Sequence, residues 1–486
     1  MISFCNPKPV ANDMMTTATE NAMAAIDKRM MGLLKLFSVR SVDINRRVIN
    51  QGNDTLYDLF YGLQTYGISV GYLAAVSYFC WIISSTYDMS HRTYFAYLIR
   101  TFFVFVIVVS GNFAQAANQF IPAADHPTSY LPLLKGKRVG LVVNHSSTYR
   151  DSIHLVDFLL SKGIRVERIF APEHGYLGKA GAGEKVEDSK DEQRQIPIVS
   201  LYGKKKKPSL EDMQGLDVVL FDIQDVGVRF YTYISTLTYV MDRAGEAGVP
   251  VIILDRPNPH RHYIDGPVLD TARFKSFVGL HPVPVVYGLT IGEYGAMVNG
   301  EGWIKHPCKL QVVYCKNYNP QERYRLPIPP SPNLPNHNAI LLYPSLCFFE
   351  GAPVSVGRGT DKPFQIIGAP WFPFGDFYFT PKPREGAPQP LFADRRCRGY
   401  DLTNFAEDFL EDEPQLHLGW LISAYNAYKQ TSNTAPFFRP FFDLLAGTDE
   451  LRKSIEAGKD EGLISQEWLP QIARYTTIRA KYSHYD

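Results

Sequence analysis

The chain has 486 residues, which is enough for two or three domains of roughly 150 residues each. Hydrophobic residues make up 45% of it and charged residues 20%, as in an ordinary globular protein with a core of useful size. Its 50 basic and 49 acidic residues give a net charge of +1, which excludes the strongly basic surface of a nucleic-acid binder.

Residues 89–116 have the pattern of a secretory signal peptide. A basic start with His91 and Arg92 precedes an apolar stretch at 102–109, and small residues flank the centre of the triplet at 114–116. We expect cleavage after this triplet, export, and a periplasmic or extracellular mature protein without a stable membrane anchor.

A signal peptide belongs at the start of a chain, so residues 1–88 need an explanation. The simplest one is that Met89 is the true start and that residues 1–88 are a spurious upstream extension. The alternative is a real extension with a membrane span, because residues 66–84 carry no charge over a length that can cross a bilayer.

The next part of the chain predicts a parallel sheet. Amphipathic segments at 152–162 and 233–247 are predicted helices that separate continuously apolar runs. This alternation is typical of a doubly wound α/β fold, and we expect a Rossmann-like domain over residues 117–325. The predicted strands are 138–144 (RVGLVVN), 166–172 (VERIFAP), 198–202 (IVSLY), 217–224 (DVVLFDIQ) and 250–255 (PVIILD).

The composition changes after about residue 320. Residues 326–336 (LPIPPSPNLPN) are rich in Pro and predict an extended connector. Loops, short strands and a helical tail follow, so we expect residues 326–486 to form a smaller α+β domain that completes a cleft.

Polar residues end or directly follow most of the predicted strands. Ligands of open α/β sheets bind beyond the carboxyl ends of the strands, so these residues are the first candidates for chemistry. They are Asn144, Glu173, Asp222, Gln224, Asp225 and Asp255.

The densest polar motif is APEHG at 171–175, which a glycine-rich loop with Glu184 follows. A carboxyl group such as that of Glu173, partly shielded at the lip of a sheet, suits a general acid, and the neighbouring His174 suits substrate binding. The alternative is a strand-end carboxylate that only accepts hydrogen bonds from loop amides.

A second motif, FDIQDVGVRFYTY, spans residues 221–233. Its Arg229 can bind a substrate carboxylate through two parallel hydrogen bonds or can pair with a nearby Asp of the chain. Tyr231 and Tyr233 can stack on a sugar or bind its hydroxyl groups. Binding roles and turn or packing roles are equally open for four later residues: Asp255, Arg256, Glu350 and Arg358.

Several motifs are absent from the sequence. It has no GxSxG elbow, no phosphate-binding P-loop and no GxGxxG, and its His and Cys residues lack the spacing of a zinc site. We therefore expect no cofactor and no metal. The lysine run at 204–207 fits a solvated loop or, as an alternative, an anion contact.

Taken together, these segments resemble the NamZ (YbbC-like) family, grouped as glycoside hydrolase family one hundred and seventy-one and formerly a domain of unknown function. The resemblance runs from about residue 131 to the C-terminal end, and nothing in residues 1–88 contributes to it. Where family loops often read NHTG or NQTG, this chain has NHSS at 144–147. The matching segments include VGLVVNHSS, FAPEHGYLG, VVLFDIQDVGVRFYTYISTL, ILDRPNP, PPSPNLP, YPSLCFFEG and VGRGTDKPFQIIGAPW.

The resemblance implies an exo-acting hydrolase that releases β-N-acetylmuramic acid from the non-reducing end of peptidoglycan fragments. It maps the proposed catalytic glutamate of the PEHG motif onto Glu173. For the second catalytic group we rank Asp225, Asp222, Glu184 and Glu350 in falling order, and for the substrate's carboxylate we consider Arg229 or Arg358. The competing functions are a non-catalytic peptidoglycan-binding protein and a deacetylase or esterase on the same fold.

Overall fold

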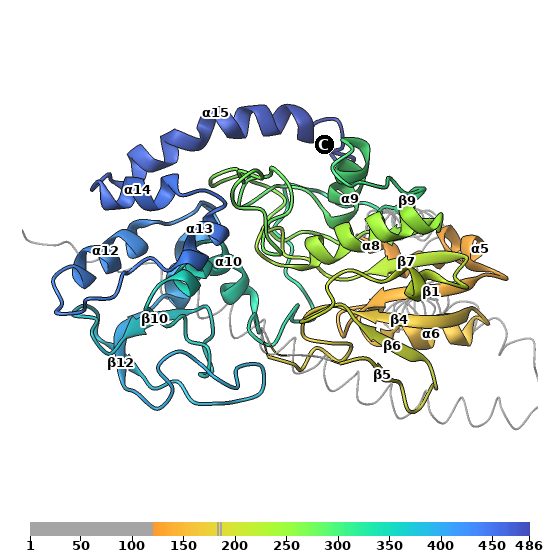
Figure 1. Ribbon diagram of the computed structural model, residues 1–486, viewed down its shortest axis with the longest axis horizontal. Coiled ribbons are helices and arrows are strands. Elements are labelled where there is room, and N and C mark those ends of the chain that lie inside the picture. The colour runs from red at the N-terminus through yellow and green to blue at the C-terminus, as the bar shows by residue number, and fades with distance from the viewer. Residues whose placement is uncertain (1–119, 182–183, 185–186) are drawn as a thin grey trace, which may run out of the picture. The chain divides into compact units, whose positions relative to one another are not determined.

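The computed structural model describes residues 120–181, 184 and 187–486 (Figure 1). Its main sheet has seven strands in the order β5-β6-β4-β1-β7-β8-β9, and only the β5–β6 pair is antiparallel. This arrangement confirms the predicted α/β fold. The strands are β1 (Arg138–Val143), β4 (Arg165–Ala171), β5 (Ser189–Lys190), β6 (Pro197–Ser200), β7 (Val218–Asp222), β8 (Val251–Leu254) and β9 (Leu310–Val313).

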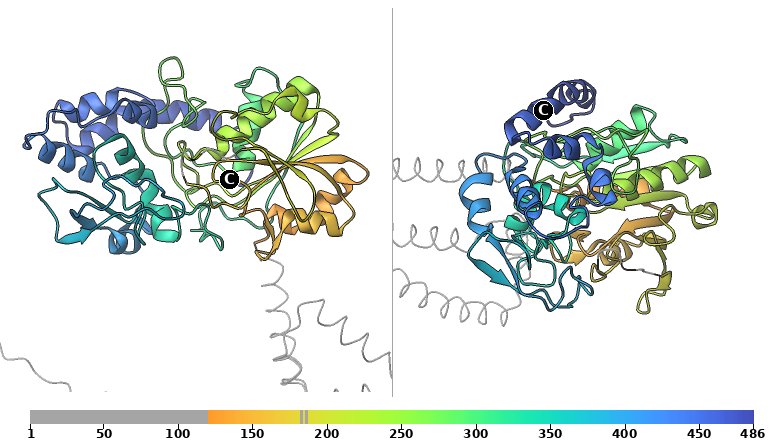
Figure 2. Two further views of the ribbon diagram at one scale, coloured as in Figure 1. Left: turned by 60° about the horizontal axis from the view of Figure 1, so that its bottom comes forward. Right: turned by 60° about the vertical axis from the view of Figure 1, so that its left-hand side comes forward.

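Both faces of the sheet are covered by helices. Successive side chains of a strand point to opposite faces, so an apolar strand has two faces to bury. In β1, Val142 joins the apolar core beneath α7 (Leu210–Met213), α8 (Tyr233–Ala247) and α9 (Ile291–Gly300). Its neighbour Leu141 joins a second core with α5 (Leu131–Leu134) and α6 (Leu155–Ser161). Figure 2 shows these two helical layers on either side of the sheet. The central strands β1, β7 and β8 are accordingly apolar and buried along most of their length, as their sequences predict.

The helix predicted at 233–247 matches α8, which ends at Gly248 in a left-handed conformation that suits glycine. The helix predicted at 152–162 starts later, at Leu155. The first residues of that predicted helix belong instead to a short hairpin of β2 (Thr148–Tyr149) and β3 (Ile153–His154). The predicted signal peptide and residues 1–88 lie outside the described residues. Within the described ranges, no helix is long and apolar enough to cross a membrane.

The smaller C-terminal domain has its own antiparallel sheet, in the order β10-β12-β11. The predicted connector at 326–336 precedes it and forms neither a helix nor a named strand. The strands are β10 (Ile366–Ala369), β11 (Phe377–Phe379) and β12 (Cys397–Asp401), and the helices are α10 (His337–Leu346), α11 (Thr403–Phe405), α12 (Gly419–Tyr428), α13 (Pro440–Ala446), α14 (Glu450–Glu456) and α15 (Glu461–Arg479).

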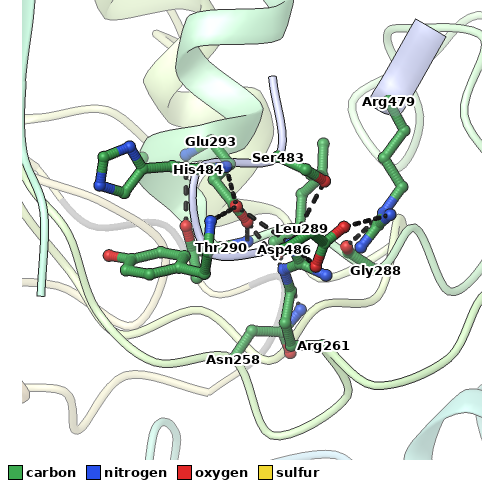
Figure 3. Close-up of polar contacts among 12 residues, drawn as sticks. Asn258, Arg261, Gly288, Leu289, Thr290, Glu293, Arg479, Ser483, His484 and Asp486 are labelled. Atoms are coloured by element: carbon green, nitrogen blue, oxygen red, sulfur yellow. Dashed lines mark hydrogen bonds and ion pairs between the residues drawn. The ribbon is translucent and has the colours of Figure 1, made fainter. Parts of the chain in front are cut away.

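The last helix, α15, runs from α14 back toward α9 of the sheet domain (Figure 1). Near its end Tyr475 donates a 2.6 Å hydrogen bond to the carbonyl of Tyr287. The residues after α15 surround a buried ion pair between Arg261 and Glu293, to which Asp486 adds a second carboxylate 3.0 Å from the Arg261 guanidinium (Figure 3). The C-terminal residues thus pack on the sheet domain, and contacts join the described residues into one compact unit.

Candidate active site

A cavity of about 810 Å³ lies at the carboxyl ends of the strands, where the sheet domain meets the C-terminal domain. The segment after β4 contributes Glu173 to its wall, and the C-terminal domain contributes Glu350 and Arg358. The Pro-rich connector adds Ser331 and Asn333, so two domains and the segment between them build one site. Its volume is within the range of sites that bind small molecules.

The position of Glu173 follows from the end of β4. The strand stops at Ala171, and the chain then turns through left-handed conformations at His174 (φ 68°) and Gly175 (φ 76°). This turn leaves Glu173 half-buried at the cavity wall, where its Oε2 accepts a 2.6 Å hydrogen bond from the hydroxyl of Thr232. The carboxyl group is thus held in place and open to a ligand.

His174 lines the cavity beside it. Its Nδ1 lies 2.7 Å from the carbonyl oxygen of Ala180, which can only accept, so Nδ1 carries the proton. Burial lowers the pKa of His174 below its ordinary value. The ring is therefore neutral near pH 7 and its Nε2 is an acceptor for a substrate O–H or N–H group.

Two further carboxyl groups of the described residues line the cavity. Glu184 is exposed, and its Oε2 accepts a 2.6 Å hydrogen bond from the amide of Gly181. Glu350 lies on a short 3₁₀ segment (Cys347–Gly351), and Arg358 binds its Oε1 through Nε at 2.7 Å and Nη2 at 2.6 Å. Arg358 also lies over the Phe364 ring, with its guanidinium carbon 5.0 Å from the centroid.

The structure brings six of the residues that we selected from the sequence together at this cavity: Glu173, His174, Glu184, Tyr231, Glu350 and Arg358. The other eight do not line it: Asn144, Asp222, Gln224, Asp225, Arg229, Tyr233, Asp255 and Arg256. Their hydrogen bonds describe what they do in the folded chain.

Two of these eight form a buried ion pair. Asp222, at the end of β7, has no exposed surface, and its Oδ2 lies 2.8 Å from Nη2 of Arg256. The same nitrogen donates a 3.0 Å hydrogen bond to the carbonyl of Thr148. Asp222 and Arg256 therefore join β7 to the segments after β8 and β1.

Asp225, our first choice for the second catalytic group, is 3% exposed. Its Oδ2 accepts hydrogen bonds from the amide of Gly227, at 2.6 Å, and from the hydroxyl of Tyr287. Burial raises the pKa of Asp225 to about 6. Its other oxygen, Oδ1, is buried without a hydrogen-bond partner in the described part of the chain.

Arg229 is fully buried, and its two terminal nitrogens bind four backbone carbonyls instead of a carboxylate. Nη1 donates to Pro267 and Val283 of the sheet domain, at 2.7 and 2.8 Å. Nη2 donates to Leu445 and Ala446 at the end of α13, at 2.9 and 2.7 Å. Arg229 thus connects the two domains directly behind the cavity wall.

The remaining four residues support backbone segments around the site. Asn144 donates a 3.0 Å hydrogen bond to the hydroxyl of Tyr233, and Gln224 donates to the carbonyl of Pro257 at 2.7 Å. Asp255 accepts from the amide of Gly292 at the start of α9, at 2.8 Å. Each of them fixes a strand end in relation to a neighbouring segment.

Sequence reasoning missed other parts of the wall. Thr232 sits in the recognised motif but carried no signal of its own, because its role depends on a contact with a residue 59 positions away. Lys206 lines the cavity, although its run reads first as a solvated loop. Phe277 and Asn333 gave no signal at all. Among the described residues, no group of three His, Cys, Asp or Glu side chains is arranged to hold a metal ion.

Comparisons with family models and with known proteins all point to one family. The family model of the exo-beta-N-acetylmuramidase NamZ N-terminal domain matches residues 139–338, and that of the C-terminal domain matches 341–485. The peptidoglycan beta-N-acetylmuramidase NamZ of Bacillus subtilis strain 168 is 34% identical over 418 residues, which cover 81% of this chain and all of that protein.

Two crystal structures of DUF1343 family proteins from Bacteroides fragilis are similar to this fold. One is 43% identical with a TM-score of 0.69, and the other is 26% identical with a TM-score of 0.65. Each comparison covers 76% of this chain and 99% of the other one.

Proposed function

The chain belongs to the NamZ family of exo-β-N-acetylmuramidases and is a glycoside hydrolase, and from this membership we propose that it removes N-acetylmuramic acid from the non-reducing end of peptidoglycan fragments. The observation that carries the proposal is the half-buried carboxyl group of Glu173 at the wall of a cavity of suitable size. In this role Glu173 is the general acid that protonates the interglycosidic oxygen as the bond to the anomeric carbon breaks.

Hydrolysis also needs a group that activates water. Asp222 and Asp225 do not line the cavity, which leaves Glu184 and Glu350 of the four carboxylates that we ranked. Arg358 engages Glu350, whereas a loop amide is the hydrogen-bond partner of Glu184. We therefore assign the second role to Glu184: it takes a proton from water while the water oxygen bonds to the anomeric carbon. Glu350, Tyr231 and His174 then bind the hydroxyl and N-acetyl groups of the sugar.

A comparison of leaving groups tests the assignment of Glu173. General acid catalysis matters most when the leaving oxygen is a poor leaving group. We expect Glu173→Gln to lower kcat by about a hundredfold or more on a muramyl disaccharide, and much less on a nitrophenyl β-N-acetylmuramide. An equal loss on both substrates, or near wild-type turnover by a folded variant, would reject Glu173 as the acid.

Product analysis separates the competing functions. A glycosidase releases free N-acetylmuramic acid, a deacetylase releases acetate, an esterase releases another acid, and a binding protein releases nothing. Glu184→Gln extends the test, because full activity in this variant would move the second role to Glu350 or to the substrate's own N-acetyl oxygen.

We also propose that the protein works outside the cytoplasm. The signal-peptide pattern of residues 89–116 supports this, and it predicts a mature chain that begins at Ala117. N-terminal sequencing of protein from the periplasm and the medium checks it. A chain that retains residues 66–84 in the membrane fraction would instead support the spanning extension.

A further inference from the structure

The substrate proposed above carries a carboxylate, and the cavity must offer it a cation that no protein carboxylate already neutralises. Two cations of the described residues line the cavity, Lys206 and Arg358. Arg358 makes two contacts below 3 Å with Glu350, and Arg229 lies outside the cavity with its guanidinium bound to backbone carbonyls. Neither arginine that the sequence suggested for this task is therefore available.

The middle residues of the lysine run at 204–207 lie in different environments, while Lys204 is exposed. Lys205 lies 2.7 Å from a carboxylate oxygen of Asp212, and Lys207 pairs with Asp242. These two lysines hold the loop against the sheet domain. Lys206, between them, lines the cavity, and no described carboxylate pairs with it.

An aromatic ring restrains the Lys206 side chain at the cavity. Its Nζ lies 4.6 Å from the centroid of the Phe277 ring, a cation–π contact. Phe277 also lines the cavity, and the Tyr239 ring is stacked near it with the centroids 6.1 Å apart. The ring limits the motion of the ammonium group without neutralising its charge, so the charge remains free for a ligand.

We propose that Lys206 and Phe277 form a subsite that binds a carboxylate of the substrate and so determines its specificity. The inference rests on the proposed function, since the carboxylate belongs to a muramyl glycan. Two sources share this chemistry. A peptide-free glycan carries a free lactyl carboxylate, whereas in a peptide-bearing glycan the lactyl group is an amide and the carboxylates belong to the peptide.

The test is steady-state kinetics of the full chain with a peptide-free and a peptide-bearing muramyl disaccharide. We expect Lys206→Gln to raise KM by about tenfold on the substrate whose carboxylate it binds, with a much smaller change in kcat. Lys206→Arg keeps the charge and should restore most of the affinity. The matched control is Lys204→Gln, because Lys204 is an exposed neighbour that does not line the cavity, and its KM should equal that of wild type.

Each outcome has a definite meaning. A rise in KM on the peptide-free substrate alone identifies the lactyl carboxylate, and a rise on the peptide-bearing one alone identifies the peptide. Added salt should raise KM for wild type more than for Lys206→Gln, because salt screens an exposed charge pair. Unchanged KM on both substrates would overturn the proposal. If wild type hydrolyses neither substrate, the proposed function fails, and calorimetric binding of N-acetylmuramic acid to wild type and to Lys206→Gln still decides on the subsite.

Discussion

The hydroxyl of Thr232 donates a 2.6 Å hydrogen bond to Oε2 of Glu173, and it joins the segments that follow two strands of the sheet. Glu173 follows β4, and Thr232 is the residue before α8, which comes after β7. Both strands are neighbours of β1, so their carboxyl ends lie on the same edge of the sheet. The contact fixes one oxygen of the proposed acid and leaves the other for the substrate.

Removal of this hydroxyl should impair turnover. We expect Thr232→Val to lower kcat by about tenfold, because the carboxyl group of Glu173 loses the partner that orients it. Thr232→Ser keeps the hydroxyl and should retain most activity. Thr236→Val is the control, since Thr236 is a buried threonine one turn along α8 that does not line the cavity. Equal kcat values for Thr232→Val and Thr236→Val would contradict an orienting role.

Arg229 should be a major contributor to stability. Arg229→Met leaves four buried carbonyls without their donor, and we expect the free energy of unfolding to fall by about 3 kcal/mol. Arg229→Lys should recover only part of this, because one ammonium group cannot reach both pairs of carbonyls. Urea denaturation measures the effect, with Arg165→Met at an exposed ion pair as the control. A loss as small as that of the control would show that the four contacts contribute little.

The pair of Asp222 and Arg256 should also act on stability. We expect Asp222→Asn to lower the free energy of unfolding by about 3 kcal/mol, because it leaves the buried guanidinium of Arg256 without its counter-charge. The double variant Asp222→Leu with Arg256→Met should lose less free energy of unfolding than the sum of the losses in Asp222→Leu alone and in Arg256→Met alone. A double-mutant cycle in urea measures this difference, and additive losses would mean that the two side chains do not depend on each other.

His281 should make the fold sensitive to acid. Burial lowers its pKa to about 3, with help from the nearby charge of Lys275, whereas an exposed His titrates near 6.5. Between these two values the unfolded chain binds a proton that the folded chain does not. The free energy of unfolding should therefore fall as the pH falls from about 6.5 toward 3, by at most about 1.4 kcal/mol per pH unit from this group.

His281→Gln removes one titrating group and should reduce that slope by its share, because burial also lowers the pKa of His260 to about 4 and that of His262 to about 3. Urea denaturation at several pH values between about 4 and about 7 provides the comparison with wild type. The control is His484→Gln, since His484 lies near the C-terminal end and is not part of the buried set that contains His281. If His281→Gln keeps the full slope, the acid sensitivity arises elsewhere.

The pattern of the sequence was sufficient to predict the sheet and to place the proposed acid just after one of its strands. Largely apolar runs such as 138–144 and 217–224, separated by amphipathic helices, predict strands covered on both faces, and the structure has β1 and β7 there. Glu173 was found because the end of a parallel strand is a fixed place in such a fold. These inferences depend on the local order of apolar and polar residues, which the sequence shows directly.

Which polar residues line the cavity depends on contacts between distant parts of the folded chain, and the sequence pattern does not show them. Asp222 ends one apolar strand and Glu173 comes shortly after another, yet Asp222 is fully buried against Arg256 whereas Glu173 lines the cavity. Likewise Lys206 lies in the cavity while its two neighbours form ion pairs. The reason is physical. A charged side chain with an oppositely charged partner in the folded chain contributes to stability, whereas one without such a partner remains available to a ligand. Those partners come from distant parts of the chain.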